Sequence, residues 1–240
     1  MNRLLFFCTL IGTGGIILNA SAGDIENKLQ LLMPEGVSLG MRQDELQALR
    51  PKAKHPALPI LGSMRTFRES HGLSQSENVI TNLPLAVLYE ADLEMPSLIH
   101  EYYFVGDQLR AVRGSVSYLE GTKDKGVVTQ VLNKYSARMV QQPDVTIIAA
   151  DSNFLLQTVT FSQWKDEQTG KVLLFFDSPE GVFPGGTQVI VFDSKYFGRK
   201  DFFLEPDDLP KITPLYDQLR KNKVQHDTRM QGFMQKTEGD

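Results

Sequence analysis

The alternation of apolar and polar residues is clearest late in the chain, where it predicts a meander of three β-strands. Val159 and Phe161 alternate with mostly polar neighbours at a period of two, which is the spacing of a half-buried strand. Two continuous apolar runs follow, and such runs fit strands covered on both faces. The predicted strands span residues 158–164, 171–177 and 187–193. Their connections are too short for parallel crossovers, so we expect antiparallel pairing.

A second group of strands is predicted earlier in the chain, over residues 85–89, 98–105 and 109–116. Gly106-Asp107 has the composition of a tight hairpin turn between two of them, and Gly170 suits the turn of a later hairpin. Residues 145–150 form a further short apolar run that fits a strand. The sequence therefore predicts a sheet-rich protein.

Apolar residues at helical spacing predict helices over residues 24–32, 41–49 and 126–139. Residues 52–78 contain Pro56 and Pro59 and predict a long surface loop, with a strand near 64–68. Thr213 and Pro214 have the composition of a helix N-cap and first helical residue, which predicts a helix over 214–223. From His226 onward the polar tail is expected to be frayed or disordered.

These elements predict an α+β fold in which helices 41–50 and 127–139 lie on one face of an antiparallel sheet. The order of helix and then strands occurs twice, which favours a tandem helix-plus-meander repeat. The expected divisions are 1–22 (signal peptide), 23–119 (first half), 120–198 (second half) and 199–240 (linker, C-terminal helix and polar tail).

The first 22 residues have the three parts of a secretory signal peptide. Arg3 supplies the basic region, residues 4–18 form an apolar core, and Ala20-Ser21-Ala22 fits a cleavage site before Gly23. The apolar core is too short for a membrane helix; the alternative is an uncleaved anchor. We expect a periplasmic or secreted protein without a membrane span.

Composition narrows the classes of function. The sole cysteine, Cys8, lies within the predicted signal peptide, so a mature chain offers no thiolate for catalysis or zinc binding. Without Arg3 the charged side chains number 24 basic and 29 acidic, a net charge near −5. This balance argues against a nucleic-acid partner.

Two short motifs resemble those of a family of exported proteins. The first is an aliphatic residue, Leu-Gly-Met and a helix with one acidic and two leucine positions; here it comprises Val37, Leu39-Gly40-Met41, Glu45, Leu46 and Leu49. The second is the aromatic hairpin at residues 103–109, with the sequence YFVGDQL. In both, the chain resembles the superfamily that includes the small outer-membrane assembly lipoproteins (SmpA/OmlA) and the β-lactamase inhibitor proteins.

The resemblance covers residues 37–116, and residues 126–193 by element order. It implies helices packed on one face of an antiparallel sheet, and binding to other proteins rather than catalysis. The chain lacks the lipidated cysteine of the lipoproteins and the cysteine pairs of the secreted inhibitors.

The usual signatures of catalysis and metal binding are absent from the sequence. The four histidines, at positions 55, 71, 100 and 226, show no metal-ligand spacing, and no nucleophile elbow or phosphate-binding loop occurs. No cofactor is expected. Glu90, Asp92 and Glu94 alternate along a predicted strand, where they form either a solvated edge or, together with His100, the carboxylates of an unfamiliar active site.

Aromatic residues give the best indication of a binding surface. Tyr102, Tyr103 and Phe104 are consecutive, so at least one of them must face away from any single core. Trp164 lies at a predicted hairpin tip, where exposed aromatic residues often contact partners. The alternative is that Trp164 folds back on the sheet and Tyr102 packs under a helix.

The sequence therefore predicts a soluble exported module that binds another protein or inhibits it in the cell envelope. Its contact surface is expected to use an open sheet face, the 52–78 loop, Trp164, Tyr102 and Tyr103. The alternatives are an exported hydrolase that uses the acidic residues with His100, and a carrier of a small ligand in a cavity beneath the sheet.

Overall fold

A computed structural model describes residues 31–55, 60–76, 85–93, 97–117, 125–135, 137–150, 154–178 and 186–237. The strands are β1 (Leu85–Asp92), β2 (Ser97–Val105), β3 (Gln108–Ser117), β4 (Val140–Ala150), β5 (Leu156–Lys165), β6 (Lys171–Ser178) and β7 (Gly186–Asp193). The helices are α2 (Gln43–Leu49), α3 (Ile60–Ser70), α4 (Lys125–Tyr135) and α5 (Leu209–Thr237), with short 3-10 helices η1 (Arg199–Asp201) and η2 (Pro206–Asp208). The predicted signal peptide, most of the predicted helix 24–32, and Glu94 lie outside the described residues.

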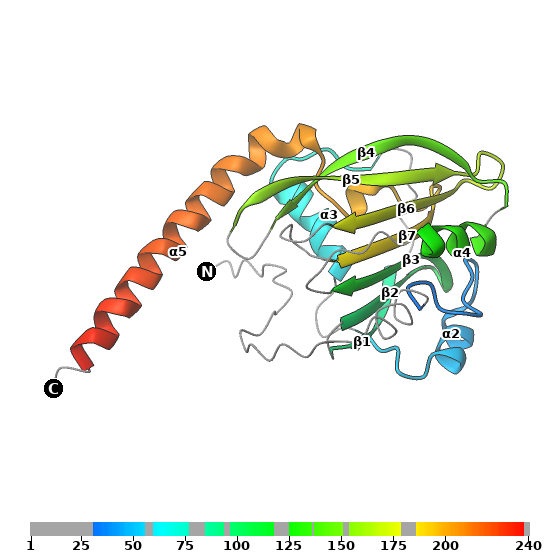
Figure 1. The fold of residues 1–240 in the computed structure, drawn as a ribbon, viewed down its shortest axis with the longest axis horizontal. Helices are drawn as coiled ribbons and strands as arrows, with labels where there is room; N and C mark the ends of the chain where they lie inside the picture. Colours follow the sequence, from blue (N-terminus) through cyan, green and yellow to red (C-terminus); the bar gives the residue numbers. More distant parts are fainter. Residues whose placement is uncertain are drawn as a thin grey trace.

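All seven strands form one antiparallel sheet in the order β1-β2-β3-β7-β6-β5-β4 (Figure 1). The predicted α+β class is confirmed, and each strand predicted between residues 85 and 193 falls within an observed one. The meander β1–β3 meets the meander β4–β7 where β3 pairs with β7, with Val112 opposite Val191. Gly106 and Gly170 occupy the two predicted hairpin turns at φ 66° and 71°, where glycine carries no steric penalty.

One side of the sheet, which we call the helical face, is covered by α2 and α4. Leu46 of α2 and Val127 and Val131 of α4 are buried in one core with residues of the strands. The strand residues in this core include Leu88, Tyr102, Phe104, Val112, Leu173 and Val191. The prediction that these two helices share a face of the sheet is confirmed.

Residues 31–37, which we call the N-terminal strap, also lie on the helical face. Leu32 is fully buried, and a Cβ atom at Gly114 would lie only 1.8 Å from the Leu32 carbonyl oxygen. Backbone thus packs directly on backbone, which only glycine permits at position 114. Lys134 of α4 donates hydrogen bonds to the carbonyls of Met33, at 3.2 Å, and Pro34. The strap is therefore fixed from both the sheet and α4.

The opposite side of the sheet, which we call the aromatic face, is covered by the segment after β7. Phe202 packs edge-on against Tyr103, with ring centroids 5.5 Å apart, and Phe203 lies 4.8 Å from the ring of Phe161. Phe197 completes this buried cluster. The prediction of an open sheet face is wrong for the central strands, because parts of the same chain cover both sides.

Two arginines of α3 fix that covering segment. Arg68 is fully buried and donates two hydrogen bonds of 2.8 Å to the Asp208 carboxylate, and two more to the carbonyls of Ser74 and Phe203. Arg65 donates a 2.7 Å hydrogen bond to Asp201 of η1. A buried charge is tolerable only when it is paired and hydrogen-bonded, and each of the three side-chain nitrogens of Arg68 donates at least one hydrogen bond.

Two elements differ from the sequence-based expectation. Residues 60–70, expected to be loop with a strand near 64–68, form the helix α3. The C-terminal helix begins at Leu209 and ends at Thr237, so Thr213 is not its N-cap and Pro214 lies inside it. The Thr213 hydroxyl instead donates to the Leu209 carbonyl one turn earlier. The tail from His226 to Thr237 is helical rather than frayed.

Candidate functional site

Tyr102 and Tyr103, two of the predicted contact residues, are buried on opposite sides of β2. Tyr102 is 0% exposed and belongs to the core of the helical face, whereas Tyr103 is 1% exposed and belongs to the core of the aromatic face. Alternation along the strand placed them correctly on opposite faces, but each face has its own cover. The prediction that they form an exposed binding surface is therefore wrong.

Trp164, the third predicted contact residue, is partly buried at the end of β5. Its side chain packs against the core of the helical face. This position matches the alternative in which the indole folds back on the sheet. Trp164 is not an isolated aromatic anchor at a loop tip.

The hydroxyl of Tyr102 leads to a buried polar group that we call the Glu90 cluster, formed by Arg50, Glu90, His100 and Tyr102. One carboxylate oxygen of Glu90 accepts hydrogen bonds from Tyr102, at 2.8 Å, and from Arg50, at 2.6 and 2.9 Å. The Nδ1 atom of His100 lies 3.3 Å from the same oxygen. The structure thus brings Glu90 and His100 together on the helical face.

Electrostatics keep Glu90 ionised in this cluster. Burial alone would raise the pKa of Glu90, but the hydrogen bonds from His100, Arg50 and Tyr102 outweigh burial and lower this pKa to about 2. Burial and the negative charge of Glu90 both raise the pKa of Tyr102. Near neutral pH, Glu90 stays charged and Tyr102 stays protonated, so neither is suited to exchange a proton with a substrate.

Within the Glu90 cluster, Glu90 and His100 are closed off from solvent, whereas Arg50 is partly exposed. The His100 side chain is 3% exposed, and its Nε2 atom lies 2.7 Å from the Leu31 carbonyl oxygen of the N-terminal strap. Of the other acidic residues considered for catalysis, Asp92 is exposed at the end of β1 and Glu94 lies outside the described residues. The solvated-edge interpretation is wrong for Glu90, which is buried and paired. The cluster fixes the strap and α2 to the sheet.

None of the predicted site residues lies in the second half of α5, which is the most exposed part of the described fold. In Figure 1 this helix leaves the body and points away from the sheet. Ile212 is fully buried, and Lys223 places its ammonium 5.9 Å from the centre of the Phe154 ring. Each residue from Val224 to Gln231 is exposed. We call residues 224–237 the distal arm.

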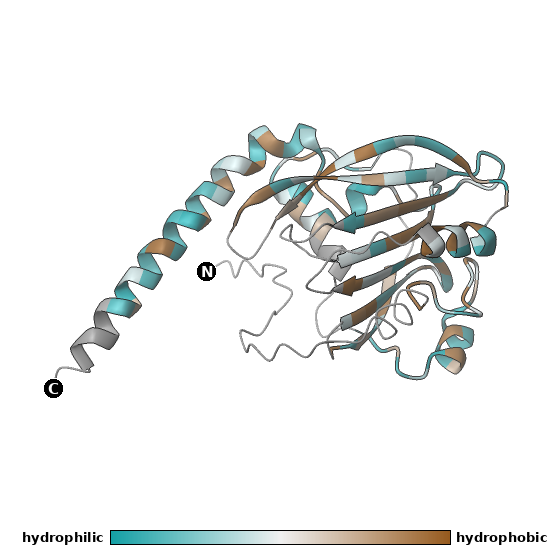
Figure 2. Ribbon diagram, viewed as in Figure 1, coloured by the Kyte–Doolittle hydropathy of each residue, from teal (hydrophilic) through white to brown (hydrophobic). Residues whose placement is uncertain are grey.

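One side of α5, which we call the stripe, runs from the body into the distal arm, where Met230 is its one apolar position among the described side chains. Ile212, Tyr216 and Leu219 follow one another at helical spacing, and Ile212 and Tyr216 join a small core of the body. The same spacing leads through Lys223 to His226 and Met230, and Met230 is 48% exposed. Figure 2 shows the resulting contrast between hydrophobic strands and a mostly hydrophilic α5 with isolated hydrophobic positions. The stripe loses its cover where the body ends.

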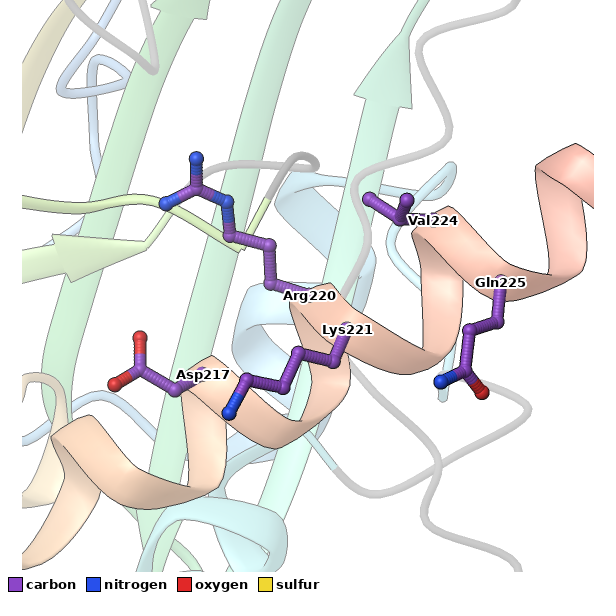
Figure 3. A pocket seen from close by; sticks show the side chains of 5 residues that line it. All are labelled: Asp217, Arg220, Lys221, Val224 and Gln225. Carbon is purple, nitrogen blue, oxygen red and sulfur yellow. The ribbon is translucent and has the colours of Figure 1, made fainter.

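A hollow of about 420 Å³ lies along α5 where the distal arm begins. Figure 3 shows the described side chains that line it, and all project from this one helix: Asp217, Arg220, Lys221, Val224 and Gln225. Catalytic and ligand sites usually converge from several elements. This hollow runs along a helix and is not the cavity beneath the sheet that the small-ligand alternative requires.

Comparisons with models of known protein families, with curated proteins and with solved structures find no match to this chain. In the part of the chain that the structure describes, no three His, Cys, Asp or Glu side chains gather as a metal site would require. Within that same part, no helix combines the length and the apolar character needed to cross a membrane.

Sequence reasoning missed the distal arm for an identifiable reason. The polar composition after Lys223 led to the expectation of a disordered tail. However, residues 215–237 are rich in Leu, Lys, Arg, Gln and Met, which have high helix propensity. The side chain of Gln218 donates a 2.9 Å hydrogen bond to Asn222 four residues later, a pairing that supports helices. This helix propensity is the signal that would have predicted the helix.

Proposed function

We propose that this chain is an exported protein-binding module of the cell envelope, and that the distal arm of α5 is its contact element. The predicted signal peptide supports the location, and the chain's resemblance to exported binding proteins supports the class of function. The observation that carries the proposal is the exposure of every residue from Val224 to Gln231 in a continuous helix.

The exposed helix calls for an explanation because isolated helices are only marginally stable in water. A helical stretch of 14 residues would be near the length at which an isolated helix loses its structure. The arm remains helical here as the extension of a longer helix anchored by Ile212. A partner that receives the arm would gain a helix that is already ordered, which lowers the entropic cost of binding.

The rest of the surface supports the arm by elimination. Because both faces of the sheet are covered at the central strands, its two edge strands are the other candidates for contact, and each carries a feature that hinders pairing. On β1, Lys54 forms an isolated bridge with Tyr89. On β4, the register shifts between Gln142 and Val145, and Pro143 interrupts the hydrogen-bonding edge. Addition of a partner strand is therefore disfavoured at both edges.

Affinity capture with full-length and truncated chains tests the proposal. The full chain and a version ending at Lys223 are immobilised and exposed to envelope extract of the producing cell. Retained proteins are then identified by mass spectrometry. We expect at least one protein to bind the full chain and to be absent from the truncated one. Identical sets of retained proteins would contradict the role of the arm.

A matched pair of point variants tests whether binding depends on the stripe or on any side of the arm. Met230→Glu places a charge on the stripe, whereas Thr228→Glu places the same charge on nearly the opposite side of the helix, two residues away. Retention should fall with the first variant and persist with the second. Circular dichroism of both proteins verifies that α5 remains helical.

A further inference from the structure

His100 lies beneath the N-terminal strap, and both nitrogens of its ring face oxygen atoms that accept hydrogen bonds. The Nε2 atom is 2.7 Å from the carbonyl oxygen of Leu31 in the strap, and the Nδ1 atom is 3.3 Å from a carboxylate oxygen of Glu90. The side chain is 3% exposed, so bulk water is largely excluded from the ring. These two oxygens are therefore the partners that decide how the ring is protonated.

The two acceptors require a proton on each nitrogen of the ring. A neutral imidazole has one N–H donor, and its other nitrogen carries a lone pair. A carbonyl oxygen can only accept, so Nε2 must donate to Leu31. If Nδ1 lacked a proton, its lone pair would face the Glu90 carboxylate, which is ionised near neutral pH because its pKa is lowered to about 2. The doubly protonated ring, an imidazolium, has a donor for each acceptor.

The charged groups of the Glu90 cluster favour the imidazolium. The Glu90 carboxylate lies directly across the strand pair and supplies the negative charge that faces the ring. Arg50 brings a second positive charge to this carboxylate, but its side chain is 33% exposed, so solvent weakens its repulsion of the ring. Tyr102 and Arg50 both donate to Glu90, so neither supplies a donor to Nδ1.

The other elements around the histidine ring place one charged side chain near the strap. On β3 the residue paired with the histidine is Gly114, which has no side chain. On α4, Lys134 donates to the carbonyls of Met33, at 3.2 Å, and of Pro34. Burial lowers the pKa of Lys134, and the charge of Glu35 in the strap opposes that effect. A lysine amine keeps N–H donors with or without its third proton, so this contact does not require the charge.

We propose that His100 is a pH switch that keeps Leu31 and Leu32 on the sheet while its ring is doubly protonated and releases them when the second proton is lost. The closed strap holds this proton, and the open strap gives it up to water. By linkage, a falling pH favours the closed form and a rising pH favours the open form. If a whole proton is released, the opening equilibrium changes by about tenfold for each pH unit.

Two features limit the switch. In strong acid, near its pKa of about 2, Glu90 becomes protonated and the imidazolium loses its negative partner. At the other end of the strap, Lys134 still holds Met33 and Pro34, so opening is confined to the first residues of the strap. The switch involves no residue of the distal arm, so it goes beyond the proposed function and does not depend on it.

Nitrogen NMR of the histidine ring tests its protonation state. The triple variant His55→Gln, His71→Gln, His226→Gln leaves His100 as the one histidine of the chain. Correlation spectra of the ring protons and nitrogens distinguish an imidazolium, whose two nitrogens resemble each other, from a neutral ring, whose nitrogens differ. We expect the imidazolium pattern near neutral pH. A neutral ring under these conditions overturns the inference.

Hydrogen exchange followed by mass spectrometry tests the release of the strap. Protection of residues 31–37, corrected for the intrinsic exchange rate at each pH, should fall at least tenfold between about pH 6 and about pH 9. Protection of β7, in the interior of the sheet, should change little and serves as the reference. His100→Gln should leave the strap weakly protected at every pH. His226→Gln, which alters an exposed histidine, is the matched control and should keep the pH dependence.

The other outcomes are equally decisive. Protection of the strap that does not change with pH overturns the switch. A pH dependence that persists in His100→Gln assigns the effect to another group and also overturns it. If His100→Gln does not fold, the triple variant decides alone, because the ring spectrum and the strap protection are both measured in it. The ring must lose its second proton over the pH range in which the strap loses protection, and separate ranges overturn the inference.

Discussion

Both faces of the sheet are covered by other parts of the chain, but different side chains hold the two covers in place. On the helical face, α2, α4 and the N-terminal strap cover the strands. The Glu90 cluster, beneath the strap, joins the strap and α2 to the strands. On the aromatic face, phenylalanines of the segment after β7 cover the strands, and Arg68 ties that segment to α3. Each cover therefore contains at least one ion pair with a buried carboxylate.

The difference lies in how completely each ion pair is removed from water. The Arg68 and Asp208 side chains are 0% and 4% exposed, whereas Arg50 in the Glu90 cluster retains 33% exposure. Electrostatic interactions strengthen as solvent is excluded, and so does the penalty for an unpaired charge. The aromatic face should therefore be the more sensitive of the two to loss of a single charge.

The largest expected effect is that of Arg68→Met. This change leaves the Asp208 carboxylate buried without its partner and should lower the free energy of unfolding by about 3–5 kcal/mol. Urea denaturation measures it. The control is Arg65→Met on the same helix, since Arg65 is 23% exposed and should cost less. Equal losses for the two variants would remove the distinction between them.

A smaller effect is expected on the helical face from Gly114→Ala. The added Cβ must displace the Leu32 carbonyl, and overpacking of this kind costs about 1–3 kcal/mol. Limited proteolysis should then cleave the N-terminal strap before the body unfolds. Ser115→Ala, at the next position of β3, serves as the control and should leave the strap protected. A strap that stays protected in the Gly114 variant would contradict the close backbone packing.

The Glu90 cluster should make stability depend on acid. Because the pKa of Glu90 is lowered to about 2 in the folded protein, its contribution is present above pH 4.5, the unfolded value, and is lost as pH falls toward 2. Glu90→Gln should remove about 2 kcal/mol of this pH-dependent stability. Urea midpoints between pH 2 and pH 6 measure the slope. Asp92→Asn, an exposed change on the same strand, should keep it.

The smallest effect on folding is expected outside both faces. A chain ending at Lys223 loses a stretch in which Val224 to Gln231 are all exposed, so its free energy of unfolding should change by less than about 0.5 kcal/mol. Urea denaturation beside the full chain measures the difference. A loss of several kcal/mol would show that the arm supports the fold and would weaken its assignment as a contact element.

The strands were accessible to sequence analysis because a period of two reports burial directly, as at Val159 and Phe161. Helix α3 was missed because Pro56 and Pro59 indicate a loop, while the buried pairing of Arg68 with Asp208 joins residues 140 positions apart. The burial of Tyr102 and Tyr103 likewise depends on segments that are distant in sequence. Alternation assigns each to a face, but only the path of distant segments decides whether that face is covered.

The Glu90 cluster shows the same limit in polar residues. Glu90 and His100 lie on paired strands, directly opposite each other, so their proximity follows once β1 and β2 are aligned. Their closure does not follow, because it depends on Arg50 after α2 and on the Leu31 carbonyl of the strap. The local sequence pattern was enough to identify Glu90 and His100 as a candidate site. Only the long-range packing shows that they have a structural role.

The pairing of β3 with β7 has a consequence for how the chain reaches its final state. The last strand to be synthesised takes a place in the interior of the sheet, so β3 waits with an unfilled hydrogen-bonding side until some 70 further residues have emerged. Contacts this distant in sequence form slowly, and an unfilled strand invites aggregation in the meantime. A chaperone that shields nascent chains would have its greatest value for this protein during that interval.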